Sequence, residues 1–156
     1  MTTPLHPDVE ALAFLLGEWR GEGRGTYPTI EDFAYREEVT FGHVGKPFVS
    51  YTQRTWALDD GRPLHSETGY LRPQPDDRLE LVLALPSGQV EMDEGTSRGG
   101  HLELTSTLVA RTPSAKEVSE IRRVLDVDGD TLRYLVEMAA VGQPRQVHLE
   151  AELHRV

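Results

Sequence analysis

With 156 residues, of which 38% are hydrophobic and 27% charged, the chain has the size and composition of one domain covering residues 1–156. The formal net charge of −10 argues against nucleic acid as a partner, because phosphates would be repelled. The chain has no cysteine, which excludes disulfides, iron–sulfur clusters and covalently attached haem. It shows neither a transmembrane-length apolar run nor a signal-peptide pattern, so we expect a cytoplasmic protein with no membrane partner.

The N-terminal segment 4–16 predicts a helix. Pro7 suits the first turn, and Asp8 suits the positive end of the helix dipole. The apolar face consists of Leu12, Phe14, Leu15 and Leu16. Because the segment is short and isolated, we expect it to cover one end of a sheet structure as a plug or lid.

After Gly17 the apolar pattern changes to the alternation of strands, and turn signals recur about every ten residues. Asp59-Asp60-Gly61 is a tight-hairpin signal, since glycine supplies the positive φ that such turns need. The expected strands are one around Trp19, one through Phe33–Phe41, and then Phe48–Leu58, Pro63–Arg72, Leu79–Leu85, Gln89–Gly95, His101–Ala110, Lys116–Leu125, Leu132–Met138 and Val147–His154.

Short turns between about ten sequential strands predict an antiparallel meander. Closing the meander into a barrel removes both unpaired edges, and a barrel of this size encloses a ligand-sized cavity. We therefore predict an all-β fold, a ten-stranded antiparallel up-and-down β-barrel with a short N-terminal helix. A two-sheet sandwich is the alternative, because short hairpins alone do not exclude it.

The first expected strand is rich in glycine and carries the pattern Gly17, Trp19, Gly21, Gly23. Glycine normally weakens a strand, so several together indicate a sharp bend or a close backbone approach. Trp19, Gly21 and Gly23 share one face, which places two bare positions beside a bulky indole. No helix and no lysine–serine pair follow, so the pattern is not a phosphate loop. We interpret it as barrel curvature with an indole closing one end.

Side chains with catalytic or metal-binding chemistry show no local pattern. No two histidines have the spacing of a zinc site, and the carboxylates are scattered without an isolated acid–base pair. In the last expected strand, strict alternation places His148 with the polar, outward-facing residues. A bulge after the Gly142-Gln143-Pro144 loop would instead turn it inward. The residues alone therefore indicate a binding barrel, with His148 either a surface residue or a ligand.

An ordered series of blocks along nearly the whole chain resembles the nitrobindins. Besides the glycine pattern, these blocks are Tyr27–Ile30, Tyr35–Glu38, His43–Phe48, Leu64–Tyr70, Thr112–Val118, Met138–Pro144 and His148-Leu149. The nitrobindins are ferric haem-binding barrels whose fold resembles the lipocalins and fatty-acid-binding proteins. The resemblance thus implies the same barrel, with one ferric haem b held non-covalently per chain.

The resemblance also implies functional residues. His148 corresponds to the axial ligand of the haem iron, Thr29 to a position close to the haem, and Lys116 to a partner for a propionate. His65 and Met138 correspond to positions near the pocket. The implied activity is haem-dependent isomerisation of peroxynitrite to nitrate, together with reversible binding of nitric oxide.

Other uses of such a barrel remain open. A haem or nitric oxide carrier or sensor would keep the cofactor, whereas a carrier of a fatty-acid-like ligand would need a cationic anchor in place of His148. The net acidity disfavours an anionic substrate, so a basic mouth would have to come from residues such as Arg20, Arg24 and Lys46. A homodimer through an exposed strand is a further expectation.

Overall fold

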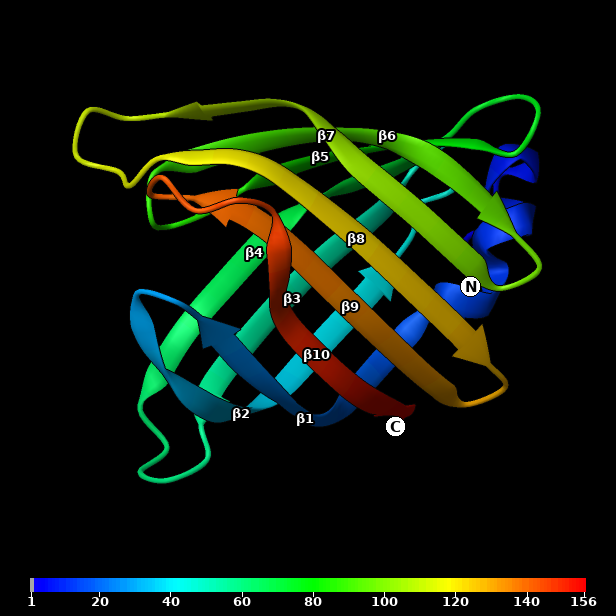
Figure 1. Ribbon diagram of the computed structural model, residues 1–156. Coiled ribbons are helices and arrows are strands. Elements are labelled where there is room, and N and C mark those ends of the chain that lie inside the picture. Colours follow the sequence, from blue (N-terminus) through cyan, green and yellow to red (C-terminus); the bar gives the residue numbers. More distant parts are fainter. Residues whose placement is uncertain (1) are drawn as a thin grey trace.

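The computed structural model describes residues 2–156 as a closed barrel of ten antiparallel strands with one short helix at its N-terminal end (Figure 1). Each strand pairs with its neighbours in sequence, and β1 closes the barrel against β10. The predicted barrel is confirmed, and the sandwich alternative is wrong because every strand within residues 2–156 is paired on both sides.

The elements of the barrel are bounded close to the expected ranges. They are η1 (Pro7–Leu15), β1 (Gly17–Tyr27), β2 (Ile30–Gly42), β3 (Val49–Ala57), β4 (Pro63–Pro73), β5 (Arg78–Ala84), β6 (Gln89–Arg98), β7 (His101–Arg111), β8 (Val118–Asp128), β9 (Thr131–Ala140) and β10 (Gln146–Arg155).

The N-terminal helix is a 3₁₀ helix that covers one end of the barrel, as predicted (Figure 1). Its buried side chains, Val9, Leu12 and Leu15, are spaced three residues apart, which matches the three-residue turn of a 3₁₀ helix. The Trp19 indole fixes the helix to β1, since its Nε1 donates a hydrogen bond to the Leu15 carbonyl oxygen at 2.7 Å. Within residues 2–156, no helix has the length and apolarity needed to cross a membrane.

The interior of the barrel changes character along its axis. The end beneath η1 is a solid apolar core, which includes Val39, Phe41, Leu71, Leu132 and Leu153. Further along the strands, the inward positions become polar, and beyond them the barrel is hollow. We call these three parts the closed end, the polar belt and the hollow end. The inward residues of β2 follow this order, with Phe41 at the closed end, Glu37 in the belt and Tyr35 at the hollow end.

The glycine-rich strand allows β1 to approach β10 closely, as its sequence predicts. A Cβ atom at Gly21 would lie 2.0 Å from the Glu152 carbonyl oxygen of β10, which no side chain could tolerate. Trp19 is fully buried at the closed end. The strand therefore bends where its side chains are missing and fills the closed end where its indole is present.

Candidate functional site

The hollow end encloses a cavity of about 1010 Å³. This volume lies near the upper limit of cofactor pockets, which span roughly 300–1,000 Å³. Most of its wall is apolar, formed by Ile30, Phe33, Leu64, Leu85, Val109, Val118, Ile121, Val136, Met138 and Leu149. The cavity is therefore suited to a large, flat, mostly apolar ligand that is fixed by a few polar groups.

His148 lines this cavity because β10 has a bulge at that position. Val147 pairs with Glu137 and Leu149 pairs with Val136, so the ladder leaves His148 as an extra residue between them. Both His148 and its neighbour Leu149 consequently face the cavity. The outward orientation expected from strict alternation is wrong, and the bulge is the physical reason.

The His148 imidazole is oriented by two contacts from the end of β1. Its Nδ1 lies 2.9 Å from the carbonyl oxygen of Thr26, which can only accept, so Nδ1 carries the proton. The Tyr27 ring packs edge-on against the imidazole, with centroids 5.4 Å apart. Burial lowers the pKa of His148, which favours the neutral ring. Nε2 is thus left as the nitrogen whose lone pair can bind a metal.

Tyr27 fixes the end of β1 to β9 and so positions Thr26. Its hydroxyl accepts a hydrogen bond from the Ala140 amide at 2.9 Å and lies 3.2 Å from the Met138 carbonyl oxygen. The Thr26 contact could not be predicted from the residue types, because every residue has a backbone carbonyl. The pairing of β1 with β10 alone reveals it.

Three of the other expected site residues line the same cavity. His65 from β4, Met138 from β9 and Lys116 from the β7–β8 loop all contribute to its wall. Thr29 does not. It is exposed in the turn between β1 and β2, next to the lining residue Ile30.

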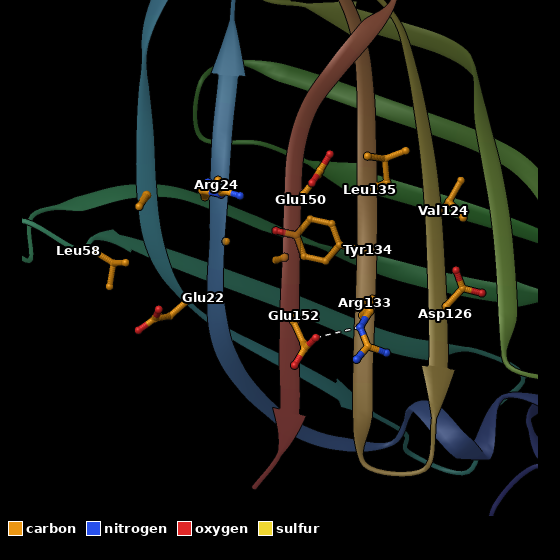
Figure 2. Close-up of a pocket in the computed structure, with 13 residues that line it drawn as sticks. Glu22, Arg24, Leu58, Val124, Asp126, Arg133, Tyr134, Leu135, Glu150 and Glu152 are labelled. Atoms are coloured by element: carbon orange, nitrogen blue, oxygen red, sulfur yellow. Dashed lines mark hydrogen bonds and ion pairs between the residues drawn. The ribbon is translucent and has the colours of Figure 1, made fainter.

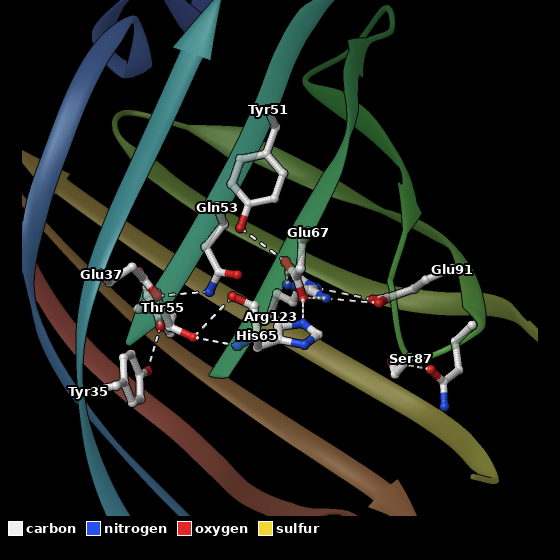
Figure 3. A network of polar contacts seen from close by, with 12 residues as sticks. Tyr35, Glu37, Tyr51, Gln53, Thr55, His65, Glu67, Ser87, Glu91 and Arg123 are labelled. Atoms are coloured by element: carbon white, nitrogen blue, oxygen red, sulfur yellow. Dashed lines mark hydrogen bonds and ion pairs between the residues drawn. The ribbon is translucent and has the colours of Figure 1, made fainter. Parts of the chain in front are cut away.

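His65 is held by neighbours on both its backbone and its ring. The Thr55 hydroxyl accepts from the His65 amide at 3.0 Å and lies 3.2 Å from the His65 carbonyl oxygen (Figure 3). The imidazole Nε2 lies 3.4 Å from Oε1 of Glu67. A bulge in β3 between Arg54 and Trp56 places Thr55 for this contact.

The polar belt is built around Arg123, which donates hydrogen bonds to two buried carboxylates (Figure 3) and lies 3.5 Å from a third carboxyl group, that of Asp93. Its Nη1 and Nη2 donate to Glu67 at 3.1 and 3.0 Å, and its Nε and Nη2 donate to Glu91 at 3.1 and 2.8 Å. The interpretation of the carboxylates as scattered is therefore wrong. They are far apart in the sequence, and the barrel brings Glu37, Glu67, Glu91 and Asp93 together.

The carboxyl groups of the belt differ in their protonation. Burial opposes the charge of Glu67, but Arg123 outweighs it and holds that pKa well below its usual range. Burial raises the pKa of Glu37 to about 7, although hydrogen bonds from Tyr134 and Gln53 favour its charged form. Burial and the neighbouring Glu91 raise the pKa of Asp93 to about 9. The belt thus holds charged and neutral carboxyl groups side by side at neutral pH.

The cations of the cavity differ from those expected at a basic mouth. Arg20 and Arg24 are exposed on the outward side of β1, and Lys46 lies in the β2–β3 loop, so that interpretation is wrong. Among the described residues, the cavity wall instead contains Lys116, Arg62 and Arg123. The sequence alone did not predict these cations of the cavity wall, because the strand order decides which residues meet at the hollow end.

The family model described as THAP4-like, heme-binding beta-barrel domain matches residues 8–155 of the chain. The chain is 59% identical to peroxynitrite isomerase 1 of Mycolicibacterium paratuberculosis, with 99% of each protein covered. It is 52% identical to peroxynitrite isomerase of Nocardia farcinica, with 97% of this chain and 92% of the relative covered. The crystal structure of Rv2717c from M. tuberculosis superposes with a TM-score of 0.92 at 51% identity, covering 98% of this chain and 99% of the other.

Proposed function

Because this chain belongs to the THAP4-like, haem-binding β-barrel family, we propose that it binds haem and isomerises peroxynitrite to nitrate. Relatives that are 59% and 52% identical over nearly their whole length are named peroxynitrite isomerases. The single observation that carries the proposal is the His148 imidazole, which a β-bulge turns toward a large apolar cavity.

The residues of the cavity fit a haem in both shape and chemistry. A volume of about 1010 Å³ with a mostly apolar wall suits a porphyrin ring. The hydrogen bond from Nδ1 of His148 to Thr26 leaves Nε2 for iron, which is the usual arrangement for a metal-binding histidine. We therefore propose His148 as the axial ligand of a ferric haem b, held non-covalently with one haem per chain.

Four further residues are proposed to contact the haem. Lys116 offers an ammonium group at the cavity wall for a propionate. Met138 and His65 offer side chains for the edge of the ring. Thr29 lies in the β1–β2 turn beside the wall, where its hydroxyl would reach only an outer group of the cofactor.

Bound haem would supply a ferric iron that acts as a Lewis acid on peroxynitrite and weakens its O–O bond. The protein would orient the side chains around the haem and shield the site. Thr26 fixes the His148 ring, the apolar wall excludes water and bulky reductants, and Glu67 with Thr55 holds His65 in one orientation. Each of these contacts restricts a side chain or the cavity wall to one arrangement, as a preorganised site requires.

Titration of the apoprotein with hemin tests the haem ligand. The wild type is expected to give a Soret band distinct from that of free hemin, and His148→Ala is expected to lose that spectrum and bind hemin more weakly. His154→Ala is the matched control, because His154 is an exposed histidine of the same strand. Identical spectra and affinities for the wild type and His148→Ala would overturn the ligand assignment.

Stopped-flow measurement of peroxynitrite decay tests the reaction itself. The ferric holoprotein is expected to accelerate decay beyond an equal concentration of free hemin, with nitrate as the product. The same ferric site is proposed to bind nitric oxide reversibly, which a shift of the Soret band on addition of nitric oxide would report. Nitric oxide binding without faster peroxynitrite decay would favour a carrier or sensor.

A fatty-acid carrier would have to use the same cavity as haem. In the polar belt the buried Arg123 already pairs with Glu67 and Glu91, so a fatty-acid carboxylate would have to bind Lys116 at the cavity wall instead. Competition between hemin and a fluorescent fatty acid tests this. We expect hemin to displace the probe completely, and a fatty acid that resists displacement would contradict the proposal.

A homodimer is proposed from a row of exposed apolar residues on the outer wall. Tyr70, Val82, Met92 and Leu108 pair in succession across β4, β5, β6 and β7. Val82→Glu is expected to give a monomer in sedimentation velocity if the wild type is a dimer through this row.

The cytoplasm is the proposed compartment, which fractionation of the native cells tests.

A further inference from the structure

Two tyrosines meet inside the barrel across the glycine-rich strand. Tyr35 on β2 pairs with Gly23 on β1, Gly23 pairs with Ala151 on β10, and Ala151 pairs with Tyr134 on β9. The row therefore places two phenol rings on either side of one bare position and one methyl group. The rings extend over this gap, and their hydroxyl oxygens lie 2.6 Å apart.

Gly23 is required for this arrangement. A Cβ atom there would lie 2.5 Å from both Cζ and Oη of Tyr35, so any side chain would displace the phenol. Gly23, the last glycine of the G-x-W-x-G-x-G pattern, therefore does more than allow the barrel to curve. It makes room for the contact between the two tyrosines.

The hydrogen bonds of the pair run in one direction and end at a carboxyl group. The Tyr134 hydroxyl donates to Oε2 of Glu37 at 2.6 Å, so the Tyr35 hydroxyl is the donor to Tyr134. Nε2 of Gln53 donates to the same Oε2 at 2.8 Å and holds the carboxyl group in place. The result is a continuous chain of hydrogen bonds from Tyr35 through Tyr134 to Glu37.

The two tyrosines face different spaces. Tyr35 lines the cavity of the hollow end. Tyr134 lines a groove of about 670 Å³ on the outer wall, together with exposed residues such as Arg24, Arg133 and Glu150 (Figure 2). The pair therefore connects the inside of the barrel to its surface through the wall.

We propose that Tyr35, Tyr134 and Glu37 form a redox relay that carries one oxidising equivalent from the cavity to the outer groove. The oxidant is nitrogen dioxide, the radical that homolysis of peroxynitrite releases, so its natural source depends on the function proposed above. Nitrogen dioxide takes one electron from Tyr35 and becomes nitrite. The Tyr35 proton moves to Tyr134, whose own proton moves to Glu37, and a tyrosyl radical remains.

The relay is completed at the surface. The radical passes from Tyr35 to Tyr134 when a hydrogen atom moves between their hydroxyl oxygens in the opposite direction. A one-electron reductant in the outer groove, such as ascorbate, then donates an electron to Tyr134, and Glu37 returns the proton. Each step conserves electrons and protons, and the relay protects the cavity from oxidant that escapes conversion to nitrate.

Glu37 is suited to accept this proton. A buried phenol cannot lose an electron and keep its proton, because a buried cation without a partner is costly. Burial raises the pKa of Glu37 to about 7, so the carboxyl group takes up and releases a proton near neutrality. The groups that face it are Tyr35 on β2, Gln53 on β3, His65 and Glu67 on β4, and Tyr134 on β9.

Pulse radiolysis of nitrite solutions, which generates nitrogen dioxide directly, tests the relay in both the haem-loaded protein and the haem-free full chain. All proteins carry Tyr70→Phe, which removes an exposed tyrosine from the outer wall. The expected result is a tyrosyl radical by optical absorption and electron paramagnetic resonance, with nitration at Tyr35 or Tyr134. Tyr35→Phe and Tyr134→Phe should lose this signal, and ascorbate should quench it in the parent protein.

Tyr51→Phe is the matched control, because Tyr51 also donates to a buried carboxylate, Glu67, at 3.1 Å but lies outside the row. It should leave the radical unchanged. In the parent protein the yield should fall as the pH is lowered through about 7, whereas Glu37→Gln should show a low yield at every pH.

A radical that persists in the Tyr35→Phe, Tyr134→Phe double variant, or a yield independent of pH in the parent protein, would overturn the relay. The pH series needs no substitution inside the barrel, so it stands even if a variant of Tyr35, Tyr134 or Glu37 fails to fold. The haem-free arm separates the two proposals. Failure to bind haem contradicts the proposed function alone, whereas absence of the radical in both arms contradicts the relay alone.

Discussion

The two ends of the barrel are made from the same strands but differ in what fills them. At the closed end, β9 contributes the fully buried Leu132, and η1 adds Val9, Leu12 and Leu15 above it. At the hollow end, the same strand contributes Val136 and Met138 to a cavity wall. Ten strands are too many for their own side chains to fill, so one end is filled by a helix and the other is left for a ligand.

The regularity of the strands differs in the same way. Bulges at His148 in β10 and at Thr55 in β3 lie at the hollow end, and each turns a functional group to its position. The closed end keeps uninterrupted pairing, such as that between Leu153 and Leu132. Apolar packing and regular strand pairing are thus concentrated at one end, and irregular strand geometry around the cavity at the other, with the polar belt between them.

The largest loss of stability is expected from a substitution in the polar belt. Arg123→Met would leave Glu67 and Glu91 buried without their partner, and removal of one side of a buried ion pair costs about 3–5 kcal/mol. Arg133→Met is the control, because Arg133 forms an exposed pair with Glu152, and such pairs are worth about 0–1 kcal/mol. Urea denaturation measures both. Equal losses would show that the belt is not essential to the barrel.

The second largest loss of stability is expected at the closed end, and two substitutions on β9 compare it with the hollow end. Leu132→Ala at the closed end is expected to cost about 2–5 kcal/mol, because a cavity is left in a packed core. Met138→Ala at the hollow end is expected to cost much less, since its side chain already borders a cavity. Hemin affinity should change in the opposite order. A haem-free Met138→Ala protein as unstable as Leu132→Ala would contradict the difference between the ends.

The pH dependence of the free energy of unfolding tests the protonation of the polar belt. The pKa of Glu37 is about 7 in the folded protein, against an ordinary value of 4.5. Between these values the folded state binds a proton that the unfolded state has lost, so the free energy of unfolding falls as pH rises through this window. The loss is on the order of 3 kcal/mol for a shift of this size.

Glu37→Gln should remove this part of the pH dependence, as measured by urea denaturation at a series of pH values. Asp93, with a pKa of about 9, should keep a further decline above neutral pH in the same variant. Glu94→Gln is the control, because Glu94 is exposed on β6. An unchanged slope in Glu37→Gln would mean that another group titrates.

The smallest effect concerns the contact between the tyrosines. Gly23→Ala would force a methyl group against the Tyr35 ring, and such overpacking costs about 1–3 kcal/mol. Adding Tyr35→Leu should recover part of the loss, because the shorter side chain leaves room for the methyl group. Thermal denaturation of the double-mutant cycle measures the recovery. Simple additivity of the two losses would contradict the proposed clash.

The sequence by itself determined the strands and the turns, and it favoured the closed barrel over a two-sheet sandwich without excluding the sandwich. Alternating residues such as Leu79, Leu81 and Leu83, followed by turn signals, depend only on near neighbours in the chain. The glycines of the first strand likewise predicted a close backbone approach, which Gly21 makes to β10. The choice of cofactor came from the resemblance to a family, since no spacing of histidines or carboxylates indicated it.

The tertiary structure alone decided the direction of His148 and the composition of the belt. A one-residue bulge reverses the face of a strand residue, and its position depends on pairing with another strand. Glu37, Glu67, Glu91 and Arg123 lie on four different strands, and they meet because barrel closure brings their inward faces to the same level. An alternating pattern predicts which side chains point inward, but only the strand register determines which of them contact one another.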